Sequence, residues 1–119
     1  MLVESSSRPV HVWHAEETLP THALFICIGG VPRTEWAGHE GILTDPQGYL
    51  ITGRDLFEPR LTDGRPTWAL PRDPYPLETS MPGLFAAGDV RHGSTKRVSA
   101  AVGEGAMAVP LVHRYLAER

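Results

Sequence analysis

The feature that most constrains this chain is a short apolar segment that ends in Gly88-Asp89 and is closely followed by a helix of small residues. A Pro-Gly turn at residues 82–83 precedes the segment, which predicts a short strand over residues 84–87. Gly88 allows close approach of backbone, and the Asp89 carboxylate can accept hydrogen bonds from hydroxyl groups. The helix start offers unpaired N–H groups and a positive dipole end. Together these features predict a place where an extended polar ligand lies against backbone.

Two segments of the chain resemble the thioredoxin reductase-like pyridine nucleotide-disulfide oxidoreductases. The family's C-terminal flavin-binding segment is matched at eight consecutive positions, Pro82-Gly-Leu-Phe-Ala-Ala-Gly-Asp89, just before the last long helix. Upstream, the run Leu24-Phe-Ile-Cys-Ile-Gly-Gly-Val-Pro-Arg-Thr34 is similar to the family's strand that crosses from the nicotinamide domain to the flavin domain. The two segments occur in the order that the family shows.

The resemblance implies a flavin site at Gly88 and Asp89 and at the helix start. Asp89 aligns with the carboxylate that binds a ribityl hydroxyl, and Lys96, Arg97 and Val98 align with the positions that contact the flavin pyrimidine. Two cations at a helix N-terminus are mildly unfavourable unless a negative group lies nearby, and reduced flavin is such a group. A solvated helix end is the other interpretation of Lys96 and Arg97, and it stays open here. Many family members carry Arg-Gln-Ala at this point, so Lys-Arg-Val departs from the pattern.

The predicted fold class is α/β: a partial FAD/NAD(P)-binding (Rossmann-like) domain with short strands, a β-hairpin and a C-terminal helix. Residues 10–15 alternate as a half-exposed strand, followed by a turn at residues 16–20, and the apolar run at residues 23–28 predicts a buried central strand. Residues 42–52 predict a hairpin around a type I turn at Asp45-Pro-Gln-Gly48. The resemblance assigns residues 1–30 to the end of the NAD(P)-binding domain and the crossover strand. It assigns residues 31–119 to the C-terminal part of the FAD-binding domain.

The closing helix is predicted to begin near Ser94 or Thr95, because either side chain can cap it. Pro110 removes a backbone donor and its ring disfavours the preceding turn, so we expect a kink or a break near Val109. Residues 53–78 are rich in Pro and Arg without a clear period, and we expect this loop to pack on the surface through Trp68 and Tyr75. The apolar residues of the helix recur at helical spacing and form one stripe: Val98, Ala101, Val102, Gly105, Val109, Val112 and Leu116.

Composition excludes several other classes of function. The net charge of −3 gives no reason to expect nucleic-acid or membrane binding, and the single cysteine excludes an internal disulfide framework. With no apolar run of membrane-spanning length and no signal-peptide core, we expect a cytoplasmic protein. Cys27 lies in the predicted buried strand and is expected to be inert packing. The histidines lack ligand spacing, so no metal site is expected, and Gly103-Glu-Gly105 favours tight packing over a phosphate loop.

The resemblance implies FAD and NADP(H) for the parent fold, but the chain lacks the family's Gly-x-Gly-x-x-Gly motifs and its Cys-x-x-Cys redox pair. Catalytic residues are therefore expected elsewhere. In one hypothesis the chain is part of a flavoprotein that passes hydride from NADPH through FAD to a disulfide or another acceptor. Its partners are then the missing N-terminal flavoprotein portion and a thioredoxin-like redox protein, and we expect no turnover from this chain alone. In the other hypothesis it is a truncated, non-catalytic remnant that self-associates through the edge of the 24–28 strand and the helix stripe.

Overall fold

The computed structural model describes residues 9–12, 15–18, 20, 22–23 and 29–118 of the chain. They fall into two compact units, Met1–Gly30 and Val31–Arg119. The assignment of these two parts to a nicotinamide and a flavin domain stays a prediction.

The first unit contains two short strands, β1 (Pro9–Val12) and β2 (Ala15–Thr18). They pair antiparallel, with Pro9 opposite Thr18 and Val12 opposite Ala15. The expectation of a single strand over residues 10–15 and a turn at 16–20 is therefore wrong. Alternation of apolar and polar residues reports the two faces of a strand but not the partner with which it pairs. The predicted central strand, with Cys27, lies outside the described residues except for Ala23.

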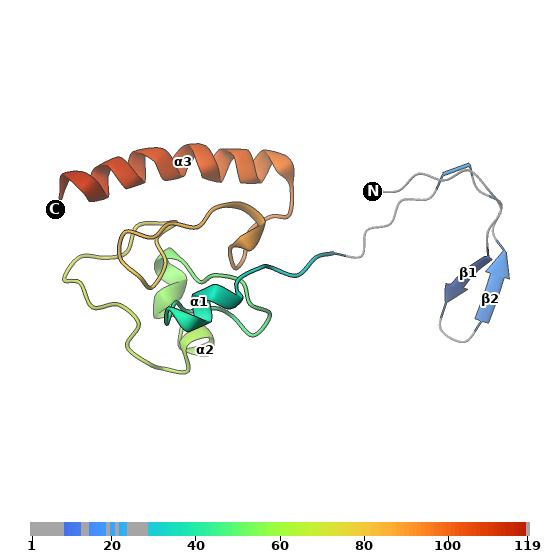
Figure 1. Cartoon of the computed structure of the whole chain (residues 1–119), viewed down its shortest axis with the longest axis horizontal. Helices are drawn as coiled ribbons and strands as arrows, with labels where there is room; N and C mark the ends of the chain where they lie inside the picture. The colour runs from blue at the N-terminus through green and yellow to red at the C-terminus, as the bar shows by residue number, and fades with distance from the viewer. Residues whose placement is uncertain (1–8, 13–14, 19, 21, 24–28, 119) are drawn as a thin grey trace. The chain divides into compact units, whose positions relative to one another are not determined.

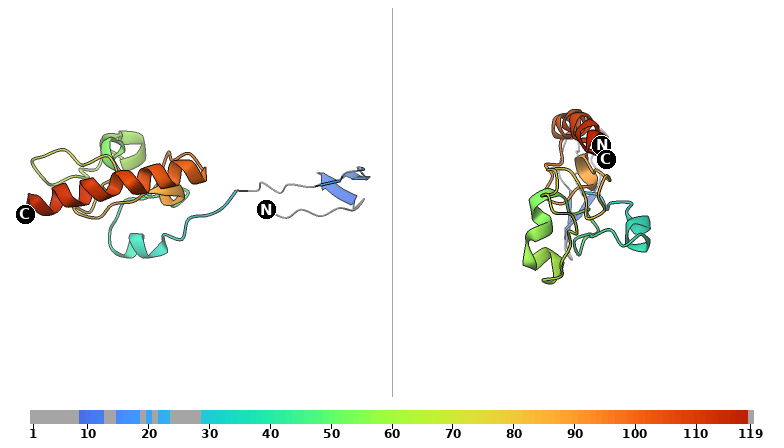
Figure 2. Two further views of the ribbon diagram at one scale, coloured as in Figure 1. Left: turned by 90° about the horizontal axis from the view of Figure 1, so that it is seen from above. Right: turned by 90° about the vertical axis from the view of Figure 1, so that its left-hand side faces the viewer.

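The second unit is partly helical. It contains α1 (Glu35–His39), the 3₁₀-helix η1 (Gly53–Phe57), α2 (Pro59–Thr62), the 3₁₀-helix η2 (Gly88–Val90) and α3 (Val98–Ala117). Figures 1 and 2 show α3 along one side of this unit, with α1 and α2 on the opposite side and extended segments between them. A small apolar cluster of Ala37, Ile42, Leu50 and Ala86 forms its core, and Leu84 and Val90 pack against this cluster.

The predicted hairpin at residues 42–52 does not form two strands. Its turn is present, because the Gly48 N–H donates to the Asp45 carbonyl at 2.9 Å, but only one antiparallel bridge follows, between Thr44 and Leu50. Leu50 also forms a parallel bridge with Arg91, which holds the segment after η2 beside the turn. The segment serves as a support for the Gly88-Asp89 region rather than as an independent hairpin.

The predicted strand at residues 84–87 is likewise reduced to a single antiparallel bridge, between Phe85 and Glu78. Positive φ angles at Gly83 and Gly88 end the extended backbone on both sides, since L-residues in a strand keep φ negative. The extended stretch is therefore too short for a regular ladder, although the Ala86 N–H still donates to the Leu77 carbonyl at 2.9 Å.

Helix α3 starts later than predicted and is not interrupted at its proline. It begins at Val98 rather than at Ser94 or Thr95, and its 20 residues form one continuous helix with Pro110 inside it, so of the expected kink or break the break does not occur. A proline inside a helix removes one backbone hydrogen bond, and the bonds of the remaining turns keep this helix continuous. No residue of α3 is fully buried, and the valines of its outer face are largely exposed, Val98 at 83% and Val102 at 66%. No helix in the described part of the chain is long and apolar enough to cross a membrane.

The Pro- and Arg-rich segment at residues 53–78 is ordered around Arg72. Its guanidinium lies 4.4 Å from the Tyr75 ring centre and 5.3 Å from that of Trp68, and it forms two hydrogen bonds with Glu78, at 2.7 and 2.9 Å. The Glu78 side chain is completely buried. Burial opposes its ionisation, but hydrogen bonds from Arg72 and from two backbone N–H groups outweigh that effect and lower its pKa. Tyr75 is buried as well, so the segment contributes to the core rather than only covering the surface.

Candidate functional site

The Gly88-Asp89 turn is held directly against the first turns of α3. Ala87 is extended, and Gly88 then takes a φ of 79°, which L-residues rarely adopt. A Cβ at Gly88 would lie 3.3 Å from the Cβ of Ala101, a tight contact, so the backbone conformation and, to a smaller extent, the packing favour glycine here. The chain turns at this point into η2, which leaves the Asp89 side chain exposed beside the helix start.

The start of α3 has no side-chain cap. Arg97 occupies the capping position in extended conformation, and its carbonyl accepts the first helical hydrogen bond, from the Ala101 N–H at 3.0 Å. The N–H groups of the first helical turn point away from the helix and have no acceptor within it. Ser94 and Thr95, the predicted caps, lie in the preceding loop, where Ser94 accepts a hydrogen bond from Lys96 instead. The N-terminus of α3 therefore keeps its free N–H donors and its positive dipole end available for another group.

Lys96 crosses from the helix side to the Gly88-Asp89 turn. Its Nζ donates to the carbonyl of Asp89 at 2.7 Å and lies 4.1 Å from the centre of the Tyr49 ring. Arg97 donates to the Lys96 carbonyl at 2.9 Å. Both side chains remain exposed, so the structure is compatible with the solvated interpretation as well as with an anionic neighbour.

These residues surround one open pocket of about 430 Å³, which we call the α3 pocket. It is lined by Asp89, Lys96, Arg97, Val98, Ala101 and Val102. Four of the five residues predicted from the sequence therefore line the same pocket, and the fifth, Gly88, packs against its wall through Ala101. Their roles toward a cofactor stay predictions.

A partly buried ion pair beside the pocket was not predicted. Glu104 lies in α3 and accepts hydrogen bonds from the Gly88 N–H at 2.7 Å and from Nε of Arg91 at 3.2 Å. The hydrogen bonds from Arg91 and Gly88 outweigh the opposing effect of burial and lower the pKa of Glu104. The only signal in the sequence was the glutamate inside Gly103-Glu-Gly105, which indicated close packing but not the partner of the carboxylate.

A second carboxylate fixes the loop that follows Asp89. Asp45 Oδ1 accepts from the N–H groups of Gln47 and Tyr49, and Oδ2 lies 2.6 Å from Nδ1 of His92. Burial opposes ionisation of Asp45, but the hydrogen bonds from His92, Tyr49 and Gln47 outweigh it and lower the pKa. The turn at residues 45–48 is thereby tied to the segment between η2 and α3, which carries Lys96.

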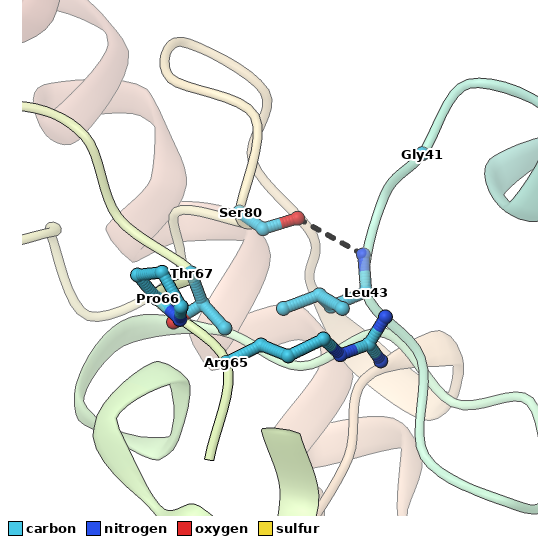
Figure 3. Close-up of a pocket in the computed structure, with 6 residues that line it drawn as sticks. All are labelled: Gly41, Leu43, Arg65, Pro66, Thr67 and Ser80. Atoms are coloured by element: carbon cyan, nitrogen blue, oxygen red, sulfur yellow. Dashed lines mark hydrogen bonds between the residues drawn. The ribbon is translucent and has the colours of Figure 1, made fainter. Parts of the chain in front are cut away.

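A second, smaller pocket of about 180 Å³ lies between the segments around Leu43, Arg65 and Ser80 (Figure 3). The Leu43 N–H donates to the Ser80 hydroxyl oxygen at 2.9 Å across it. The Ser80 hydroxyl oxygen accepts a backbone hydrogen bond, so its evident role is to join two segments of the chain. Among the residues that the structure describes, no group of three His, Cys, Asp or Glu side chains could hold a metal ion.

Comparisons with known proteins give a consistent result. The chain is 31% identical over 104 residues to a thioredoxin reductase of Listeria monocytogenes, a match that covers 87% of this chain and 26% of that protein. It is 31% identical over 100 residues to a thioredoxin reductase of Debaryomyces hansenii, with coverage of 84% and 25%. A thioredoxin reductase of Mycoplasma pneumoniae is 29% identical over 96 residues, with coverage of 81% and 24%.

The chain thus spans about a quarter of the length of the curated relatives it matches. No model of a known protein family matches it.

Proposed function

We propose that this chain, which resembles thioredoxin reductases over most of its length, forms part of the FAD site of a flavoprotein oxidoreductase. The observation that carries the proposal is the α3 pocket. A carboxylate from one turn, two cations and the open end of a helix meet there, although the sequence separates them by several residues.

The residues of the α3 pocket fit a flavin in three respects. The exposed Asp89 carboxylate can accept hydrogen bonds from the hydroxyl groups of the ribityl chain. The uncapped start of α3 offers N–H donors to the electron-rich pyrimidine edge, near the positive charges of Lys96 and Arg97. Ala101 and Val102 form an apolar wall with short side chains, against which a flat ring can lie. These are the residues that would hold the cofactor.

Bound FAD would supply the electron relay between a reduced nicotinamide and the acceptor. The residues of this chain would orient the flavin and place positive charge beside its pyrimidine edge. We further propose NADPH as the donor and a disulfide or another acceptor as the substrate, with a thioredoxin-like protein as the redox partner. The remaining flavoprotein polypeptide would provide the rest of both cofactor sites, and the single cysteine suits a cytoplasmic, reducing setting.

The exposed face of α3 favours a second candidate, a non-catalytic module that associates with its own copies. Val98, Val102 and Val109 are 83%, 66% and 57% exposed along one side of the helix. Apolar surface of this kind favours association. Sedimentation analysis of the purified chain distinguishes the candidates: a stable homo-oligomer that does not bind FAD favours this second function.

Titration with FAD, followed by flavin fluorescence, tests the first proposal on the chain alone and on the chain supplied with the remaining flavoprotein polypeptide. We expect Asp89→Ala to weaken binding, because a hydrogen bond to a charged group contributes about 1.5–3 kcal/mol, which corresponds to roughly a tenfold to a hundredfold change in Kd. Asp73→Ala is the matched control, since Asp73 is also exposed and lies outside the pocket. Equal affinities of the two variants would contradict the assignment of Asp89.

A further inference from the structure

We infer that Glu104 is a positioning residue, which fixes the Gly88-Asp89 turn in the place required for ligand binding at the α3 pocket. Glu104 does not line the pocket and acts through its neighbours. The inference rests on the proposed function, because the ligand whose binding it affects is the flavin.

The Glu104 carboxylate holds Asp89 from both sides. It accepts the N–H of Gly88, the residue before Asp89, at 2.7 Å. It also accepts two hydrogen bonds from the guanidinium of Arg91, two residues after Asp89. The backbone that carries Asp89 is therefore tied to α3 on both sides through one carboxylate. The side chains of Glu104 and Arg91 are only 15% and 18% exposed, so water competes weakly for these bonds.

The same turn also holds Lys96, another residue that lines the pocket. Lys96 Nζ donates to the carbonyl of Asp89 at 2.7 Å and to that of Arg91 at 3.4 Å. Glu104, through the turn, thus sets the places of an anionic and a cationic group that both face the ligand. A displacement of the turn would change both at once.

Glu78 provides a matched control within the same chain. Like Glu104, it is a sheltered carboxylate that binds one arginine, Arg72, and also accepts a hydrogen bond from a glycine N–H, that of Gly83. Among the hydrogen bonds of the described residues, none joins Glu78 to a residue that lines the α3 pocket. A role in folding alone would make the two carboxylates equivalent for ligand binding.

The test compares Glu104→Gln with Glu78→Gln in the full 119-residue chain. Glutamine keeps one acceptor oxygen but loses the charge, so one of the two anchors is lost. We expect Glu104→Gln to weaken FAD binding at least tenfold, measured by flavin fluorescence, and Glu78→Gln to change it less than twofold. In spectra of the ¹⁵N-labelled proteins without FAD, the amide signals of Asp89 and Lys96 should move in Glu104→Gln only.

Equal FAD affinities of the two variants, with unmoved Asp89 and Lys96 signals, would overturn the inference. If the unaltered chain binds no FAD, the proposed function fails for the chain alone, and the amide signals decide the role of Glu104. Signals that move only in Glu104→Gln support it, and unmoved signals overturn it.

The exchange variant Arg91→Glu/Glu104→Arg separates the ion pair from the backbone anchor. It restores opposite charges but places a donor opposite the Gly88 N–H. We therefore expect the exchange variant to be more stable than either single variant, while its affinity for FAD stays low. Full recovery of affinity would show that the ion pair alone is sufficient, and would overturn the anchoring of Gly88.

Discussion

Replacement of Arg72 by alanine should destabilise the chain strongly, because it leaves the Glu78 carboxylate buried without its cation. The Glu78 side chain is 0% exposed and that of Arg72 is 25% exposed. Removal of one partner of a buried ion pair costs about 3–5 kcal/mol. The lower end applies here, since Arg72 is partly solvated and Glu78 keeps the N–H groups of Tyr75 and Gly83. We therefore expect a loss of about 3 kcal/mol, which is a large part of the stability of an ordinary domain.

Urea unfolding followed by circular dichroism measures this loss. With a slope of about 1.5 kcal/mol per molar urea, the midpoint should fall by about 2 M. Arg60→Ala is the control, because Arg60 is exposed on α2 and should change stability by less than about 0.5 kcal/mol. The double variant Arg72→Ala/Glu78→Gln should be more stable than Arg72→Ala alone, since it removes the uncompensated charge. A midpoint of Arg72→Ala within 0.5 M of the unaltered chain, a margin of about 0.75 kcal/mol at that slope, would refute the reasoning.

Three further predictions concern other parts of the chain. Gly83→Ala should lower the thermal midpoint, because its Cβ would lie 2.6 Å from the Tyr115 ring at a backbone φ of 85°, whereas the exposed Gly103→Ala should not lower it. The pKa of Glu78 is lower in the folded chain than in the unfolded chain, so its contribution to stability is present above about pH 4.3 and is lost as the pH falls through the folded pKa. Urea midpoints at pH 7 and pH 3 should therefore differ less in Glu78→Gln than in the unaltered chain, and equal differences would contradict this. Cys27→Ala should leave FAD binding unchanged, and a clear loss of affinity would show that the thiol is not inert.

The local turn around Gly88 was easier to predict than the fold that surrounds it. The Gly88-Asp89 turn and the approximate helix start follow from local chemistry, namely a glycine that allows close approach of backbone and a carboxylate next to a strand end. The structure brings Asp89, Lys96 and Val98 to one pocket. The helix cap was predicted wrongly, because Ser94 has the chemistry of a cap but accepts its hydrogen bond from Lys96.

The remaining errors come from contacts between residues that are distant in sequence. The partners of Glu104 lie 13 and 16 residues away, and no spacing rule connects them. The order of the 53–78 segment depends on one arginine that lies against aromatic rings, which composition cannot reveal. A regular strand was predicted at residues 84–87, but glycines with positive φ at both ends leave the extended stretch too short for one.

Helix α3 supplies three residues of the pocket wall yet has no fully buried residue of its own. A helix that packs on one side only opens more often than one enclosed by the core, and its amides should exchange with solvent accordingly. A cofactor in the pocket and a polypeptide over the exposed part of the helix beyond it, around Val109, would each slow that opening, so each would make the other's binding less costly in entropy. Thermodynamic reciprocity then requires that cofactor uptake and assembly strengthen one another by the same factor.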